Sequence, residues 1–406
     1  MRKDIEEFER YEFKERKNFR FLKLLSKILV LLIVFLLGRY SYISENSVIN
    51  SNTLDKINVF EKYINDNFVL EKNIKNMQDG LLRGMFLGLG DPYSFYMTKE
   101  EVKKDKEMIE GSFVGVGINI KASPDNRIVV ISPIEGGPAE KAGILAGDII
   151  NKIDGKEYKG ENLREAVKAT RGIAGKKVNL EILRPNGNDF EVKNFEIIRE
   201  EILEKSVYHQ KINDLGYIRI KSFLKATDID FKKAYDELKA LDVKGIVIDL
   251  RNNGGGLLSS CANIMDMFLD DCQLVKIHKK SEDLVLMAKD NLNEKIPLVF
   301  LGNESTASAS EVMIGTFKDY GRAKFIGVKT YGKGISQNVF VNDDGSGCQI
   351  TNGVLELPSG RRYHKEGILP DFEVKLPENV KNIGVENLNE DVQLQKAIEV
   401  LSKEIR

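Results

Sequence analysis

Hydrophobic residues divide this chain of 406 residues into regions with different spacing. A mostly apolar stretch covers residues 21–43, and apolar residues then recur at helical spacing over residues 44–106. Short alternating segments separated by glycine turns fill residues 107–200, which predicts a β-rich domain. Strand-like and helix-like segments alternate over residues 201–385, so we expect an α/β layer with helices on both sides of a sheet.

The α/β region contains individual elements that the pattern predicts. Short apolar runs predict strands at residues 216–220, 245–250 and 297–301, the last two of them buried. Helical spacing between and after these runs predicts helices at residues 228–241, 257–269 and 311–320. A buried strand followed by a helix therefore occurs at least twice in this region.

Two helical regions have apolar faces whose partners the sequence does not identify. The segment 386–406 has an apolar stripe made of Leu394, Ala397, Ile398 and Leu401. Such a stripe predicts packing, either on the same core or on a second subunit. The segment 44–106 is interpreted as a structural arm or an oligomerisation element, so a homodimer or a regulatory adaptor is left open as a partner.

The apolar stretch 21–43 predicts a transmembrane signal anchor. Basic residues are concentrated before it, and Arg39 is the only base after it until Lys56. The positive-inside rule then places residues 1–20 in the cytoplasm and everything after about residue 43 outside the cell membrane. A cleaved secretory peptide is the alternative, but no small-residue cleavage site follows Gly38.

Composition narrows the classes of function. Apolar residues make up 42% and charged residues 30% of the chain, which is ordinary for a globular protein. The net charge is -1 and no basic stripe carries interleaved aromatic residues, so we expect no nucleic-acid partner. The three cysteines and three histidines lie in no metal-binding spacing, so we expect neither a metal nor a cofactor.

Candidate catalytic residues follow the buried strand 297–301. Ser308 stands where this strand meets the next helix, and backbone N–H groups at a helix N-terminus can bind an anion. Lys333 stands between two glycines, and Gln337 follows four residues later. A purely structural interpretation is also available, because Ser308 and Glu311 fit the S-x-x-E pattern of a helix capping box.

A run of three glycines, residues 254–256, follows the buried strand 245–250. Consecutive glycines let backbone N–H groups approach a ligand or a reacting atom closely. The G-x-x-x-x-G-K-[ST] pattern of a phosphate-binding loop is absent. An ordinary glycine turn remains the structural alternative.

Residues 137–155 read Gly-Pro-Ala-Glu-Lys-Ala-Gly-Ile-Leu-Ala-Gly-Asp-Ile-Ile-Asn-Lys-Ile-Asp-Gly, a pattern that resembles the PDZ domain. The resemblance implies that a peptide's terminal carboxylate binds a glycine loop while the peptide adds to the sheet as a strand. It assigns the carboxylate loop to Gly115, Val116 and Gly117, with Ile118 and Ile120 along the groove. Arg171 is a further candidate contact, or simply a charge at a helix C-terminus. A PDZ-like fold with an empty groove is the alternative.

The order of these motifs, over about residues 54–377, resembles the carboxyl-terminal processing peptidases, also called tail-specific proteases. The resemblance implies an α/β serine-peptidase core of the crotonase-like kind. It also implies that Ser308 is the nucleophile, Lys333 the general base and Gln337 the residue that positions the lysine. The oxyanion hole would consist of the N–H groups of Ala309 and Gly255, with Gly254 as an alternative to Gly255.

This chemistry requires a neutral lysine. A serine hydroxyl becomes an effective nucleophile when a neighbouring base removes its proton, and Ser-Lys pairs are a known variant. The lysine pKa must then fall from about 10.4 by roughly 3 units, and burial of the ammonium supplies a shift in this direction.

The sequence thus predicts a membrane-anchored, extracytoplasmic serine endopeptidase that cleaves proteins near their C-termini. Its PDZ domain would either deliver the substrate tail or release an inhibited state. Two rival hypotheses are a non-catalytic PDZ scaffold with an inactive peptidase-like domain and a crotonase-like acyl-transfer enzyme.

Overall fold

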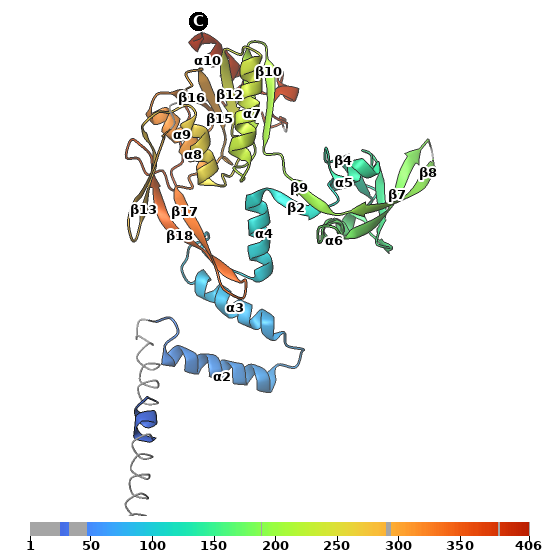
Figure 1. The fold of residues 1–406 in the computed structure, drawn as a ribbon, viewed down its shortest axis with the longest axis vertical. Helices are drawn as coiled ribbons and strands as arrows, with labels where there is room; N and C mark the ends of the chain where they lie inside the picture. The colour runs from blue at the N-terminus through green and yellow to red at the C-terminus, as the bar shows by residue number, and fades with distance from the viewer. Residues whose placement is uncertain (1–24, 32–46, 188, 290–293, 381, 406) are drawn as a thin grey trace, which may run out of the picture. The chain divides into compact units, whose positions relative to one another are not determined.

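The computed structural model describes residues 25–31, 47–187, 189–289, 294–380 and 382–405 (Figure 1). The chain divides into two compact units, residues 1–89 and 90–406. Most of the predicted anchor, residues 21–43, lies outside the described residues. The part that is described, residues 25–31, is helical. Within the described part of the chain, no helix has the length and apolar character needed to cross a membrane.

The first unit contains two amphipathic helices, α2 (Ser51–Asn67) and α3 (Ile74–Leu87). They confirm the helical spacing predicted for this part of the chain. Asn50 and Asn73 cap them, because each side chain accepts a hydrogen bond from a backbone N–H in the first turn. Neither helix contains a buried residue.

The predicted PDZ domain contains a sheet in the order β3-β4-β5-β7-β8, with β6 (Lys156–Glu157) paired to β5. Its strands are β3 (Ile118–Ala122), β4 (Ile128–Pro133), β5 (Ile149–Ile153), β7 (Lys177–Asn186) and β8 (Asp189–Ile198). Two helices accompany the sheet, α5 (Pro138–Ala142) and α6 (Leu163–Thr170). The core is aliphatic and includes Val116, Ile128, Ile150, Leu180 and Ile182. Apolar side chains at alternate strand positions therefore build this domain, as the spacing predicts.

Two antiparallel strands connect the PDZ domain to the rest of the chain. β2 (Ser112–Gly115) enters the domain and β9 (Glu200–Leu203) leaves it, and the two pair with each other. Before β2 lies α4 (Lys99–Glu110), which begins with a capping box between Thr98 and Glu101. This helix is rich in charged residues and contains no buried one, and the capping box stabilises its first turn.

The α/β region predicted at residues 201–385 is built on a six-stranded sheet in the order β10-β11-β12-β15-β16-β19. β10 (Val207–Ile212) is antiparallel to β11 (Leu215–Ile220), and the remaining neighbours are parallel. These remaining strands are β12 (Gly245–Asp249), β15 (Leu298–Gly302), β16 (Ala323–Gly327) and β19 (Phe372–Glu373). The two strands predicted to be buried, β12 and β15, are buried at every position.

Helices cover both faces of this sheet, as predicted. One face packs against α7 (Thr227–Ala240), α8 (Leu258–Asp266) and α9 (Ala309–Asp319). The other face packs against α10 (Val392–Glu404), through Leu394, Ala397 and Leu401. The C-terminal apolar stripe therefore packs on the chain's own core, which decides between the two alternatives that the sequence leaves open.

A second, antiparallel sheet carries the segment that follows Lys333. Its order is β1-β18-β13-β14, and β17 also pairs with β18. The strands are β1 (Phe95–Met97), β13 (Gln273–Lys279), β14 (Leu284–Met287), β17 (Ile335–Val341) and β18 (Gly347–Glu356). Because β1 pairs with β18, residues 95–97 of the predicted arm lie in this sheet. They bring the preceding turn to the loop that contains Lys333.

Candidate active site

Ser308 is the N-cap residue of α9, directly after the loop that leaves β15. Its backbone has φ +58° and ψ −120°, a conformation that residues with a side chain rarely adopt. Strain of this kind persists where the surrounding structure imposes it, and it is concentrated at functional sites. Ser308 is half-buried, and in the described structure no acceptor takes the N–H of Ala309. The turn thus places a hydroxyl beside a free donor at a helix N-terminus.

The glycine loop after β12 lies directly against this serine. A Cβ atom added to Gly255 would stand 2.8 Å from Ser308 Cβ and 3.1 Å from Ala309 N. Gly255 also has φ +102°, so both space and conformation require glycine there. Its N–H donates to Asn253 Oδ1 at 2.9 Å. The N–H of Gly254 has no acceptor among the described residues, and a Cβ at Gly254 would meet nothing within 4 Å.

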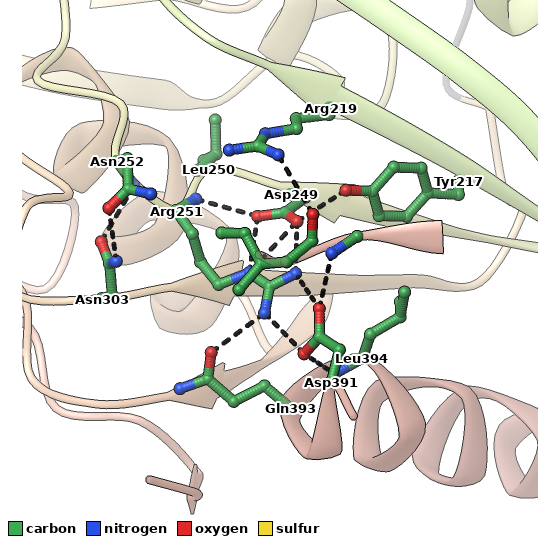
Figure 2. Close-up of polar contacts among 12 residues, drawn as sticks. Tyr217, Arg219, Asp249, Leu250, Arg251, Asn252, Asn303, Asp391, Gln393 and Leu394 are labelled. Carbon is green, nitrogen blue, oxygen red and sulfur yellow. Dashed lines mark hydrogen bonds and ion pairs between the residues drawn. The ribbon is translucent and has the colours of Figure 1, made fainter. Parts of the chain in front are cut away.

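A buried ionic network fixes the start of this loop (Figure 2). The side chain of Arg251 is fully buried between the carboxylates of Asp249 and Asp391, at 2.6 Å and 2.8 Å. Tyr217 donates its hydroxyl to Asp249 at 2.7 Å, and Arg251 also donates to Gln393 Oε1 at 3.1 Å. Arg251 thereby joins β12 to α10, two elements far apart in the sequence.

A pair of asparagines joins the glycine loop to the loop before Ser308 (Figure 2). The backbone N–H of Asn252 donates to Asn303 Oδ1 at 2.9 Å, and Asn303 Nδ2 donates to Asn252 Oδ1 at 2.8 Å. Asn303 and Asn252 follow the neighbouring parallel strands β15 and β12. The two loops are therefore held in register at the same edge of the sheet.

Glu311 connects the serine to the lysine loop. Its fully buried carboxylate accepts the Ser308 N–H at 2.9 Å, the Gly332 N–H at 2.7 Å and the Lys333 N–H at 2.8 Å. It also accepts the hydroxyl of Thr330 at 2.5 Å. Hydrogen bonds to a carboxylate are short and strong, so this one side chain sets the spacing between both catalytic candidates. The capping interpretation of Glu311 is thus correct, and the same carboxylate also holds the Lys333 loop.

Gly332 and Gly334 allow this loop to lie against the chain around residues 364–367. A Cβ at Gly332 would stand 2.9 Å from Gly367 N, and one at Gly334 would stand 2.8 Å from His364 N. Only residues without a side chain fit between these two backbones. The two glycines that flank Lys333 in the sequence are therefore required by packing.

The amine of Lys333 is half-buried, and burial lowers its pKa below the ordinary value of 10.5, while the nearby Asp91 carboxylate opposes this shift. Its Nζ lies 4.7 Å from the centre of the Tyr93 ring. No hydrogen bond within the described structure joins Nζ to Ser308 or to Gln337. Gln337 lies on β17 beside a register shift, and its Nε2 donates to Ile335 O at a long 3.4 Å. Ser308 and Lys333 are thus tied together through the Glu311 carboxylate and not by a direct side-chain contact.

The predicted peptide-binding residues of the PDZ domain line one groove. Gly115, Val116, Gly117 and Ile118 lie along it with Arg171. The guanidinium of Arg171 stacks over the Phe113 ring at 4.6 Å. Ala139 N donates to Val116 O at 2.8 Å, which holds the glycine loop against α5. The groove therefore combines a glycine loop with a strand edge, and cationic side chains, Arg171 among them, line it.

Several residues of the site are not predicted by the sequence. The S-x-x-E pattern predicts Glu311 only as a cap, although its position next to a candidate nucleophile is a usable signal. The turn that contains Asp91 and Tyr93 falls within the predicted helical arm, and nothing in its spacing connects it with Lys333. Arg251 and Asp391 are 140 residues apart, so no local pattern could pair them.

Comparisons with known proteins agree with this architecture. The Peptidase family S41 model matches residues 214–374, the PDZ domain model matches 106–183, and the model of the Activating protease CtpB N-terminal domain matches 40–101. In structure, the chain resembles a protein of Bacteroides fragilis described as an S41 protease. The TM-score is 0.51 at 18% identity, over 78% of this chain and 87% of the other, so this likeness concerns the fold alone.

Two relatives are similar over most of the chain. A Staphylococcus aureus protein described as a "Probable CtpA-like serine protease" is 36% identical over 369 residues, which are 89% of this chain and 73% of the relative. The Bacillus subtilis "Carboxy-terminal processing protease CtpA" is 34% identical over 355 residues, which are 86% of this chain and 75% of the relative. The chain therefore belongs to the CtpA-like carboxy-terminal processing proteases, serine peptidases of family S41 with a PDZ domain.

Proposed function

We propose that this protease uses Ser308 as its nucleophile and Lys333 as its general base. The observation that carries the proposal is the Glu311 carboxylate, which binds the backbone N–H groups of both residues. Two further features support it, namely the strained backbone of Ser308 and the lowered pKa of Lys333. A base of lowered pKa held near a strained hydroxyl suits acyl transfer.

In the proposed reaction, neutral Lys333 takes the proton of the Ser308 hydroxyl while Oγ attacks the scissile carbonyl carbon. The negative charge that develops on the carbonyl oxygen is stabilised by N–H donors. The ammonium then gives its proton to the leaving amine, and a water molecule activated by the same lysine hydrolyses the acyl-enzyme. Gln337 would position the amine through a neutral hydrogen bond that forms during the reaction, since its side chain donates to Ile335 O in the structure.

We assign the oxyanion donors to Ala309 and Gly254. Both N–H groups are without an acceptor in the part of the chain that the structure describes. The sequence favours Gly255 with Gly254 as the alternative, but the Gly255 N–H already donates to Asn253. Gly255 instead lets the loop approach Ser308, so its role in this proposal is close packing.

The proposed substrate is a protein tail whose free carboxylate binds Gly115, Val116 and Gly117. The test is the affinity of the Ser308→Ala protein, which leaves the peptide intact, for one apolar-ended peptide with a free or an amidated C-terminus. Amidation removes the charge that the loop N–H groups bind, so we expect binding to weaken about 10- to 100-fold. Equal affinities in a titration calorimeter would contradict carboxylate recognition, and loss of binding in Ile118→Asp would place the peptide in this groove.

We also propose that residues 21–43 anchor the protease in the cell membrane, with residues 1–20 in the cytoplasm and the catalytic part outside. The apolar stretch and the basic residues before it support this orientation. We expect the full chain to stay in the membrane pellet after alkaline extraction and its catalytic part to be degraded by protease added to spheroplasts. Release of the intact chain by alkali, or protection from protease, would contradict the proposal.

A further inference from the structure

The turn before β1 brings an aromatic ring to the Lys333 amine. The Nζ atom of Lys333 lies over the Tyr93 ring, 4.7 Å from its centre, which is within the range of a cation–π interaction. No hydrogen bond or ion pair links Nζ to any residue that the structure describes. The Tyr93 ring is thus the partner that the structure gives to this ammonium.

Tyr93 is held through its backbone, and its hydroxyl contacts a second tyrosine. Gln349 Nε2 donates to the Tyr93 carbonyl at 3.0 Å, and the Tyr93 hydroxyl lies 3.5 Å from that of Tyr331. The hydrogen bond with Tyr331 and burial raise the pKa of Tyr93 to about 12, so its ring stays neutral at physiological pH. A neutral, fixed ring presents its negative face to the lysine.

Asp91 shapes the turn and adds a charge near the lysine. Its carboxylate accepts the Tyr93 N–H at 3.0 Å and the Ser94 hydroxyl at 2.6 Å. The Ser94 hydroxyl in turn accepts the Thr351 N–H at 2.9 Å, which attaches the turn to β18. Asp91 therefore fixes Tyr93 and also favours the charged form of Lys333 electrostatically.

We propose that Tyr93 is a positioning residue that holds the protonated Lys333 in a resting place and, with Asp91, sets the pH at which Lys333 becomes a competent base. This inference rests on the proposed role of Lys333. A ring face attracts the ammonium and not the neutral amine, so it stabilises only the form that cannot accept the serine proton. Base catalysis then requires the amine to lose its proton and leave the ring.

Other ionisable groups also surround this loop. Tyr331 belongs to the loop itself, Glu311 belongs to α9, and His364 belongs to the segment against which the loop packs. Glu311 uses its carboxylate on backbone N–H groups and one hydroxyl, and His364 approaches Gly334 through its backbone. Asp91 and the Tyr93 ring are the groups that act on the amine itself, Asp91 through its charge and Tyr93 through its ring face.

The test is the pH dependence of kcat/KM in the full chain, with Tyr93→Leu compared with Tyr93→Phe. Leucine keeps an apolar wall but removes the ring, so the lysine pKa falls and the acid limb of the profile should move about one pH unit lower. Phenylalanine keeps the ring face, so its acid limb should stay within about 0.3 unit of the wild type. A Leu profile that coincides with the wild-type profile, or moves to higher pH, would overturn the proposal.

Asp91→Asn is a second variant in case the leucine protein does not fold. Its amide oxygen can still accept the Tyr93 N–H, but the negative charge is gone, so the acid limb should again move lower. An unmoved limb would contradict the proposal. Lys333→Met distinguishes a wrong assignment of the base from a wrong role of Tyr93 and Asp91. If Lys333→Met keeps the activity and the acid limb of the pH profile, Lys333 is not the base. If it is inactive while Tyr93→Leu and Asp91→Asn behave as wild type, only the role of Tyr93 and Asp91 is wrong.

Discussion

Replacing Lys333 by methionine should lower kcat by at least about 10³-fold, because no group then takes the proton of the Ser308 hydroxyl. Methionine fills a similar volume without an ionisable group, so the loop held by Glu311 can keep its backbone hydrogen bonds. Removing a half-buried amine also removes a desolvation cost, so the free energy of unfolding should stay equal or rise. The measurement is single-turnover cleavage of a peptide together with urea unfolding.

Lys329→Met is the matched control for this prediction. Lys329 is exposed and precedes the same loop, so its replacement should change kcat by about twofold or less. Retention of more than about a tenth of the wild-type kcat in Lys333→Met would exclude Lys333 as the base. Loss of activity together with a large loss of stability would instead assign Lys333 a structural role.

Replacing Arg251 by methionine should have the largest effect on stability. The change leaves the Asp249 and Asp391 carboxylates buried without their common partner (Figure 2). Breaking a buried ion pair by removing one partner costs about 3–5 kcal/mol, because the remaining charges are uncompensated. We expect a decrease of this size in the free energy of unfolding of the peptidase core, measured by urea denaturation.

Two further variants sharpen this test. Arg362 makes an exposed ion pair with Glu356 at 3.1 Å, so Arg362→Met should cost about 1 kcal/mol or less. Adding Asp391→Asn to Arg251→Met removes one of the two unpaired charges and should recover part of the lost stability. A loss in Arg251→Met no larger than in Arg362→Met would show that the network does not hold α10 to the glycine loop.

The regular part of this fold follows from local patterns. The buried runs that became β12 and β15 and the helical spacing that became α7 and α9 are properties of neighbouring residues. The PDZ pattern is equally local, because its turn glycines and apolar positions lie within one continuous segment. Spacing along the chain therefore predicts these elements and their order.

The connections that build the site are not local. Arg251 meets Asp391, and the Tyr93 ring meets Lys333, only after sheets with long crossovers have formed. The hydrogen bond that the Gly255 N–H donates to Asn253 depends on the conformation of the loop, and a run of glycines leaves this conformation undetermined. The types of side chain and their spacing indicate the nucleophile and the base, whereas the contacts that hold these two residues in place exist only in the folded chain.

The acid–base behaviour of the Lys333 amine tests this account most directly. Competitive acetylation of the intact Ser308→Ala protein between pH 6 and pH 11, about the range over which a lysine titrates, would give the pKa of each amine by mass spectrometry. We expect a pKa for Lys333 clearly below its ordinary value of 10.5. A Lys333 pKa at or above 10.5 would contradict the proposed role of this residue as the base.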